Sequence, residues 1–238
     1  MTNLEMQREF ERLLVTMNPE FKDKEKPDTD TVGHFLTMAQ NRYLKENYLE
    51  GGRQAVIQQK VNEIQNIVAR ETVNVIEITS GPYSKGNGYS YDLSGLSNNF
   101  MFYVRSDSLI TVSADLPDYQ CTDQWTPNKF IDYADLDNVL TTPYNEPILI
   151  QPRVVLEQNN GDKLIIISDK YTTIKLTGGL HLTYIKEPQE ISILQDQDCE
   201  LPIHMHEPIT KLSVDMYVLE YKYRLYGGQQ QQEQQTNR

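Results

Sequence analysis

The segment KLIIISDKYTTIKLTGGLHLTYIK, residues 163–186, decides the fold of the second half of this chain. Short runs of β-branched and aliphatic residues alternate in it with turn residues, and runs of this length are typical of strands. Gly178-Gly179 separates the last two runs and predicts a turn between them. We therefore predict successive antiparallel strands at 163–168, 172–177 and 180–186.

Similar runs extend this pattern toward the N-terminus. The tetrad Asn159-Asn160-Gly161-Asp162 precedes the first of these strands and predicts a hairpin turn. A short helical or turn region is expected over 130–140. The additional strands are expected at 72–79, 100–105, 108–114 and 148–157, so the middle of the chain is predicted to be a β meander.

Residues 80–99 are rich in Gly, Ser, Asn and Tyr, and this composition predicts a long loop. Loops of this length are uncommon unless they bind a ligand, cover a site or reach a neighbouring subunit. Tyrosine suits such surfaces because its ring is apolar and its hydroxyl is polar. The candidate interface residues of this loop are Tyr83, Tyr89 and Tyr91.

The first 71 residues show helical periodicity instead, with helices expected over 2–17, 31–48 and 53–69. Thr2 and Glu5 form a capping box at the start of the first helix, and Asp30 or Thr29 is expected to cap the second. Each helix carries an apolar stripe: Met6, Phe10, Leu13 and Met17; Val32, Phe35, Leu36, Ala39 and Tyr43; and Ile57, Val61, Ile64 and Val68.

A further helix is predicted over ITKLSVDMYVLEYKYRLY, residues 209–226. Its apolar positions advance by alternate steps of three and four, which is typical of a seam that faces a partner helix: Ile209, Leu212, Met216, Leu219, Tyr223 and Tyr226. We expect the aliphatic half to pack against the N-terminal helices. The aromatic half has tyrosines on more than one face, so we expect it to be held between subunits; alternatively, these side chains pack under the chain's own β domain. The candidate interface residues here are Tyr217, Tyr221, Tyr223 and Tyr226.

These elements predict an α+β fold, in which a helical bundle of three N-terminal helices plus the C-terminal helix accompanies a central antiparallel β domain. Gly227-Gly228 is expected to end the last helix. The expected domains are an N-terminal helical region at 1–71, a β domain at 72–200, the C-terminal helix at 201–227 and a disordered Gln-rich tail at 228–238.

The composition limits the functions that the chain can have. The net charge is -12 and the pI is about 4.8, so a tight, sequence-independent grip on phosphates is not expected. The longest aliphatic run, Leu164–Ile167, is far shorter than the roughly 18 residues that suggest a membrane span. The start MTNLEMQREF shows no secretion pattern, and Cys121 and Cys199 are expected to be reduced thiols.

No motif in the sequence indicates catalysis or a cofactor, since it has no Walker loop, no G-x-S-x-G elbow and no dinucleotide-binding glycine pattern. Residues 204–207, HMHE, are the densest cluster of potential metal ligands, but no second ligand pair at zinc-like spacing accompanies them. Residues 28–39 resemble the front of a calcium loop, but its twelfth position is Ala39 rather than a carboxylate. We expect no catalytic, cofactor or metal site.

Four segments together resemble structural proteins of crAss-like and related phages of Bacteroidetes. The shared features are an Asp-Thr helix start, an Ala-Gln pair followed by an aromatic residue, a Tyr-Ile-Lys-x-Pro strand end and a Cys-Glu-Leu-Pro lead into the last helix. Pro208 departs from that pattern, because those relatives often carry a helix former there, and the Gln-rich tail is not part of it. The segments are DTDTVGHFLTMAQNRYLKENY (28–48), FMFYVRSDS (100–108), LHLTYIKEPQEI (180–191) and CELPIHMHEPITKLSVDMYVLEY (199–221).

This resemblance implies a non-enzymatic virion protein that forms a ring in the portal-proximal neck or tail and connects capsid to tail around a DNA channel. The implied partners are copies of itself in a dodecameric ring, the portal and adjacent ring proteins, with DNA only as passing cargo. The protein would be made in the host cytoplasm and located in the virion. An acidic lumen would let DNA slide rather than bind.

Two other readings stay open from the sequence. One is a sugar- or peptide-binding module that uses the Tyr- and Gly-rich loop 80–99 as its site. The other is a hydrolase whose site the motifs do not reveal.

Overall fold

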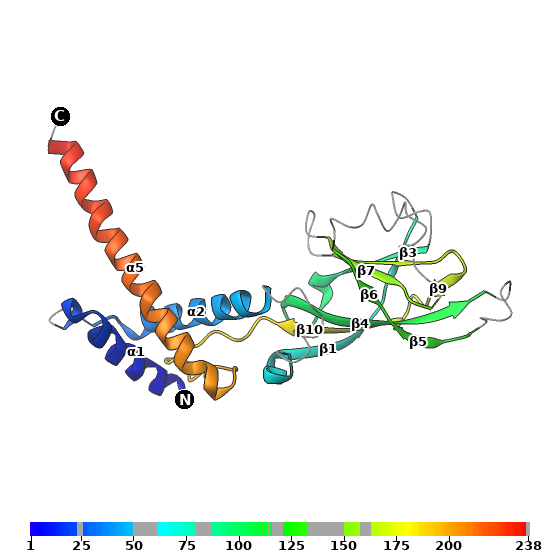
Figure 1. Ribbon diagram of the computed structural model, residues 1–238, viewed down its shortest axis with the longest axis horizontal. Coiled ribbons are helices and arrows are strands. Elements are labelled where there is room, and N and C mark those ends of the chain that lie inside the picture. The colour runs from blue at the N-terminus through cyan, green and yellow to red at the C-terminus, as the bar shows by residue number, and fades with distance from the viewer. Residues whose placement is uncertain are drawn as a thin grey trace. The chain divides into compact units, whose positions relative to one another are not determined.

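The computed structural model describes residues 1–22, 26–49, 61–79, 87–113, 115, 121–132, 150–157 and 163–236. It shows an α+β protein with helices and largely antiparallel sheets (Figure 1). The chain divides into two compact units. We call Met1–Ile67 with Pro188–Arg238 the helical unit, and Val68–Glu187 the β unit.

Helix α1, Asn3–Met17, begins where the capping box predicts. The Thr2 hydroxyl accepts a hydrogen bond from the Glu5 amide at 3.3 Å, and the Thr2 amide donates to the Glu5 carboxylate at 2.8 Å. The expected stripe is displaced by one position in its second half, since Leu14 is buried and Leu13 only half-buried. A 3.6-residue turn from Phe10 reaches Leu14 better than Leu13.

Helix α2, Thr29–Leu49, follows the short 3-10 turn η1, Pro19–Phe21. The predicted cap is wrong by one or two residues, because Asp28 accepts the Thr31 amide at 2.6 Å. Hydrogen bonds from Thr31 hold the pKa of Asp28 below its ordinary value. On this helix Gly33 permits a close approach, since a Cβ there would lie 3.0 Å from the Ile191 carbonyl oxygen.

Most of the predicted third helix lies outside the described residues. Its described end is a helical turn at 61–63, followed by the 3-10 helix η2, Gln65–Ile67. The prediction that the helix continues through Ala69 is wrong, because Val68 and Ala69 already belong to a strand and are paired with Ile185 and Tyr184.

Helix α5, Ile203–Thr236, packs against both α1 and α2 (Figure 1). Gly227-Gly228 does not end this helix, contrary to the sequence prediction. Gln and Glu favour helices, so a Gln-rich continuation tolerates the two glycines. Among the described side chains of α5, the buried ones are Met205, His206, Ile209, Thr210, Ser213, Val214 and Val218.

The segment between the β unit and α5 also belongs to the helical unit, although the sequence placed residues 188–200 in the β domain. Its backbone is tied to the helices. The Gln189 carbonyl accepts from the side-chain Nε2 of Gln40 at 3.0 Å, and the Ile191 backbone amide donates to the Thr37 hydroxyl at 2.9 Å. These bonds explain why the boundary falls at residue 188 rather than 200.

The β unit contains two five-stranded sheets. In the first sheet, β10 and β5 flank β4, β1 pairs with β10, and β9 also pairs with β4. The second sheet has the order β2-β3-β8-β7-β6, and only its β6–β7 pair is parallel. The strands are β1 (Val68–Val73), β2 (Ile76–Ile78), β3 (Asn87–Asp92), β4 (Phe100–Val112), β5 (Gln124–Pro127), β6 (Lys129–Phe130), β7 (Arg153–Glu157), β8 (Lys163–Ser168), β9 (Thr172–Ile174) and β10 (Leu180–Lys186).

The main core of the β unit lies between the two sheets. Both sheets contribute fully buried side chains to it, such as Ile110 and Leu182 from the first and Ile166 from the second. A smaller cluster of Val155, Ile165 and Ile167 occupies the opposite face of the second sheet. Burial of β8 on both faces explains its continuous apolar run, because a strand buried on one face alone would alternate.

Two strand predictions need correction. The runs predicted at 100–105 and 108–114 form one continuous strand, β4, with irregular register against β10.

Gly178-Gly179 does not make a hairpin, because β9 and β10 both run antiparallel to β4 and hence in the same direction. The chain instead bulges over Leu109, whose carbonyl accepts from the Lys175 amide and whose amide donates to the Gly179 carbonyl.

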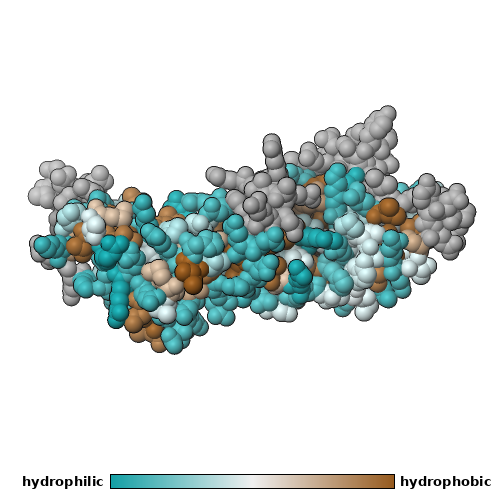
Figure 2. All heavy atoms as spheres, turned by 60° about the horizontal axis from the view of Figure 1, so that its bottom comes forward, coloured by the Kyte–Doolittle hydropathy of each residue, from teal (hydrophilic) through white to brown (hydrophobic). Residues whose placement is uncertain are grey.

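In the part of the chain that the structure describes, no helix combines the length and apolarity needed to cross a membrane. Figure 2 shows one face of the molecule, on which hydrophilic residues predominate and hydrophobic residues form small separate groups.

A half-buried carboxylate joins two segments of the β unit. Glu71 of β1 accepts hydrogen bonds from the Tyr184 hydroxyl at 2.5 Å and from the Ser97 amide and hydroxyl at 3.2 and 3.1 Å. Burial raises the pKa of Glu71, but these bonds lower it by more, so the pKa lies below its ordinary value of 4.5. Burial, and then the bond to Glu71, raise the pKa of Tyr184 to about 12.

We predict that Ile209→Ala lowers the free energy of unfolding by about 2–5 kcal/mol, because this α5 side chain is fully buried. Leu212→Ala is the matched change one turn away. It should lower the free energy of unfolding by only about 1 kcal/mol, because Leu212 is half-buried. Urea unfolding followed by circular dichroism measures both losses. Equal losses would show that Leu212 belongs to the core.

We also predict that Glu71→Gln destabilises the protein by about 1 kcal/mol at neutral pH. The lowered pKa means that the carboxylate stabilises the fold above its unfolded-state pKa, and that this contribution is lost as pH falls through the folded-state value. The melting temperatures of wild type and variant should therefore converge below about pH 4. A difference that stays constant from neutral to acid pH would contradict this role.

Candidate assembly interface

Of the three candidate tyrosines of segment 80–99, the structure places Tyr89 and Tyr91 in a strand rather than in a loop. Tyr83 lies outside the described residues. Residues 87–95 are not a loop but strand β3 followed by the 3-10 helix η4, Leu93–Gly95. The alternation in Asn-Gly-Tyr-Ser-Tyr-Asp was a strand signal that the turn-like composition obscured.

Tyr89 and Tyr91 belong to the β core or its margin. Tyr89 is 3% exposed, and its hydroxyl accepts a hydrogen bond from the Ile174 amide at 3.0 Å. Tyr91 is half-buried against the same core. Burial raises the pKa of both hydroxyls. Tyr89 therefore has no side-chain surface to offer a partner, and its assignment to an interface is corrected.

Tyr217 and Tyr221 of α5 lie in an aromatic cluster inside the helical unit. The Tyr217 ring centroid is 5.8 Å from that of Phe10, 6.0 Å from that of Phe21 and 5.3 Å from that of Phe35. Tyr221 packs against Phe21 at 4.9 Å. These two tyrosines thus join α5 to α1, η1 and α2 of the same chain. Part of each ring is covered by these contacts, so the whole ring cannot form the predicted contact between subunits.

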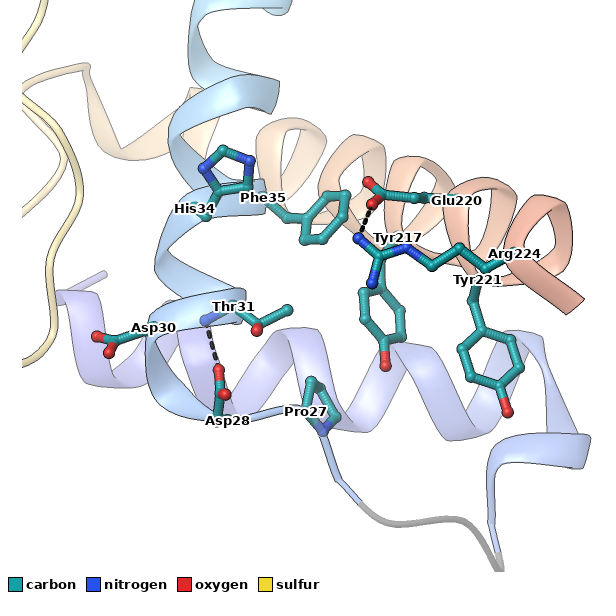
Figure 3. A pocket seen from close by; sticks show the side chains of 10 residues that line it. All are labelled: Pro27, Asp28, Asp30, Thr31, His34, Phe35, Tyr217, Glu220, Tyr221 and Arg224. Carbon is teal, nitrogen blue, oxygen red and sulfur yellow. Dashed lines mark hydrogen bonds and ion pairs between the residues drawn. The ribbon is translucent and has the colours of Figure 1, made fainter. Parts of the chain in front are cut away.

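A pocket of about 520 Å³ opens beside this cluster, between the start of α2 and the second half of α5 (Figure 3). Aromatic rings of Phe35, Tyr217 and Tyr221 form part of its wall. Arg224 also lines it and forms an ion pair with Glu220, one turn earlier on α5. The remaining lining residues are Pro27, Asp28, Asp30, Thr31 and His34.

The pocket combines aromatic, acidic and basic side chains. Its three carboxylates, Asp28, Asp30 and Glu220, outnumber its one arginine.

The predicted seam of α5 is divided between the interior and the surface, since Ile209 is buried, Leu212 and Met216 are half-buried, and the two described positions after them are exposed. At 3.6 residues per turn, Leu212, Met216, Leu219 and Tyr223 share one side of the helix, opposite the buried Val214 and Thr210. Leu219 is 66% exposed and Tyr223 is 80% exposed. We call Leu212, Met216, Leu219 and Tyr223 the outer stripe.

Of the aliphatic half of this seam, which was expected to pack against the N-terminal helices, Ile209 is fully buried, whereas Leu212 and Met216 are only half-buried. The other buried side chains of this part of α5 include the small polar Thr210 and Ser213. Their hydroxyls donate to backbone carbonyls of α5, at 2.8 and 2.6 Å, so they are tolerated inside. The Tyr226 side chain is not among the described parts of the chain.

The candidate metal and thiol residues are placed as follows. Within the described ranges, no group of three or more His, Cys, Asp or Glu side chains is arranged to hold a metal ion. His204 is exposed, whereas His206 is buried with its Nε2 2.7 Å from the Leu201 carbonyl oxygen. The buried Cys199 thiol donates to the Gln40 side-chain oxygen at 3.0 Å, and burial raises its pKa to about 11. A thiol with this pKa is a poor nucleophile at neutral pH.

Comparison with known proteins adds no further identification: no protein-family model matches this sequence, and no curated protein matches it significantly.

Proposed function

We propose that this protein is a non-enzymatic structural subunit of a phage particle, which assembles with copies of itself into a ring in the portal-proximal neck or tail. The observation that carries the proposal is the outer stripe of α5. Its residues are spaced by four, three and four positions, and its last two are largely exposed to solvent. A stripe with this spacing is complementary to another helix.

The energetics favour covering this stripe. Burying an exposed aliphatic or aromatic side chain contributes about 1.5–3 kcal/mol, so Leu219 and Tyr223 together could supply several kcal/mol to an association. Interfaces are enriched in Tyr and Met, and this stripe carries one of each. In a closed ring every subunit uses two different surfaces, so the outer stripe would meet a second, distinct surface of its neighbour.

The length of α5 supports the same reading. This helix runs for 34 residues, whereas α1 has 15 and α2 has 21. In Figure 1 the C-terminal part of α5 continues beyond α1 and α2. Isolated helical segments are marginal in water, so a projecting end is better explained by a partner that packs along it.

The sequence resemblance supplies the particular assembly. Structural proteins of crAss-like and related phages share the four segments quoted above, and they suggest a dodecameric ring that contacts the portal and neighbouring rings. The net charge of -12 suits a channel through which DNA passes without binding. On this proposal the protein is located in the virion after synthesis in the host cytoplasm.

We predict that the double variant Leu219→Ser, Tyr223→Ser abolishes self-association while it leaves the stability of the monomer within about 0.5 kcal/mol of wild type. Both side chains are exposed in the monomer, so their loss should weaken only the contact between subunits. Light scattering coupled to size exclusion at about 100 μM protein, with negative-stain microscopy, measures the assembly.

Two further variants serve as controls. Met38→Ser removes an α2 side chain that is 40% exposed, and it should leave assembly intact. Tyr217→Ala should instead destabilise the monomer by about 3–5 kcal/mol, because it empties the aromatic cluster. The proposal fails if wild-type protein stays monomeric at this concentration, or if the double variant assembles normally.

A further inference from the structure

The first sheet of the β unit carries an exposed aromatic pair. Trp125 of β5 stacks on His181 of β10, with ring centroids 3.6 Å apart and ring planes inclined by 13°. Trp125 is 39% exposed, and His181 is also exposed. Strand β4 lies between β5 and β10, so the two side chains meet across it.

The pair lies on the outer face of this sheet. Along β4, the buried Ser106, Ser108, Ile110 and Val112 alternate with Arg105, Asp107, Leu109 and Thr111. Successive residues of a strand point to opposite faces, so the second set shares the outer face. Leu109 is paired with Trp125 and Asp107 with His181, which puts both rings on that face as well.

Charged side chains of both signs accompany the pair. The Arg105 guanidinium donates to Asp107 at 3.1 and 2.6 Å. The Lys175 ammonium lies 3.9 Å from the Asp123 carboxylate. The exposed Arg70 of β1 adds a third cation to this face, since it is paired with Thr183, which is paired with Arg105. The outer face therefore carries charges of both signs and offers both donors and acceptors.

We propose that this face is a binding platform for an oligosaccharide, with Trp125 as its centre. One face of a pyranose ring presents C–H groups, which pack against the electron-rich face of an indole. Its hydroxyl groups both donate and accept, so they match an ion pair such as Arg105–Asp107 that can do the same. His181 covers one face of the indole, and Trp125 is still 39% exposed.

The surroundings favour a sugar over a protein partner. The neighbours of Trp125 on this face are mainly polar or charged, and Leu109 is the one aliphatic side chain among the four outer residues of β4. Protein interfaces place their aromatic anchors in a core depleted of charge, which this face does not provide. The inference concerns the β unit alone and is independent of the ring proposed above.

The sequence provides a direct readout, because Trp125 is the only tryptophan in the chain. Intrinsic tryptophan fluorescence of the full-length protein therefore reports on this site alone. The probes are maltohexaose, cellohexaose, mannohexaose and chitohexaose, each titrated to about 10 mM. At least one should produce a saturable change in emission intensity or wavelength. No change with any of these oligosaccharides would overturn the proposal.

Variants then locate the binding, which isothermal titration calorimetry can follow without tryptophan. Trp125→Ala should weaken affinity for the responsive oligosaccharide at least tenfold, and Asp107→Asn should weaken it by a smaller factor. Ile76→Ala is the matched control, since it truncates a side chain that is 71% exposed in the other sheet, and it should bind as wild type does. Undiminished affinity in a folded Trp125→Ala protein would show that the sugar binds elsewhere and would overturn the platform.

Discussion

The helical unit depends on the packing around Tyr217. This ring contacts Phe10 of α1, Phe21 of η1 and Phe35 of α2, so one side chain of α5 joins three separate N-terminal segments. Large aromatic rings bury more area than any aliphatic side chain, and edge-to-face contacts add to that gain. The pocket beside the cluster and the orientation of the outer stripe both follow from it, because this packing fixes which side of α5 points inward.

The contact also sets the order in which the chain can fold. The residues of the cluster lie at the two ends of the sequence, so the N-terminal helices stay uncovered until α5 is available. The β unit, by contrast, is one contiguous stretch, Val68–Glu187, and can form its sheets without either end. Domains generally fold as units during synthesis, and the parts nearer the N-terminus fold first. The segment 188–200 then completes the helical unit through its bonds to Thr37 and Gln40.

The sequence predicted the elements whose signals are local. The capping box of α1 is confirmed because Thr2 and Glu5 act within a single turn, and β8 and β10 are confirmed because their apolar runs have strand length. Predictions were wrong where the structure of a segment depends on contacts with residues far away in the sequence. Gly178-Gly179 has the composition of a hairpin turn, but only the pairing of both flanking strands with β4 shows that it is a bulge.

The interface residues show the same limit. Tyr89 looked like a loop residue because glycine and serine surround it, and only its partner Ile174 reveals that it is core. The predicted seam of α5 has helical spacing, yet periodicity alone does not say which of its positions face inward: Ile209 is buried, whereas Leu219 and Tyr223 are exposed. Thr210 and Ser213 face the interior instead, since small hydroxyl residues that bond to their own helix backbone can be buried there. The Trp125–His181 stack joins residues 56 positions apart and gave no local signal.

The pairing of β1 with β10 has a consequence for how this protein could have arisen. Val68, where the chain enters the β unit, is the direct partner of Ile185, just before the chain leaves it. The entry and exit points are therefore one strand spacing apart, about 5 Å. A helical protein needs to open only a short gap in its chain to accept such an insert, and the sheets between could be exchanged without moving the helices that hold the ends.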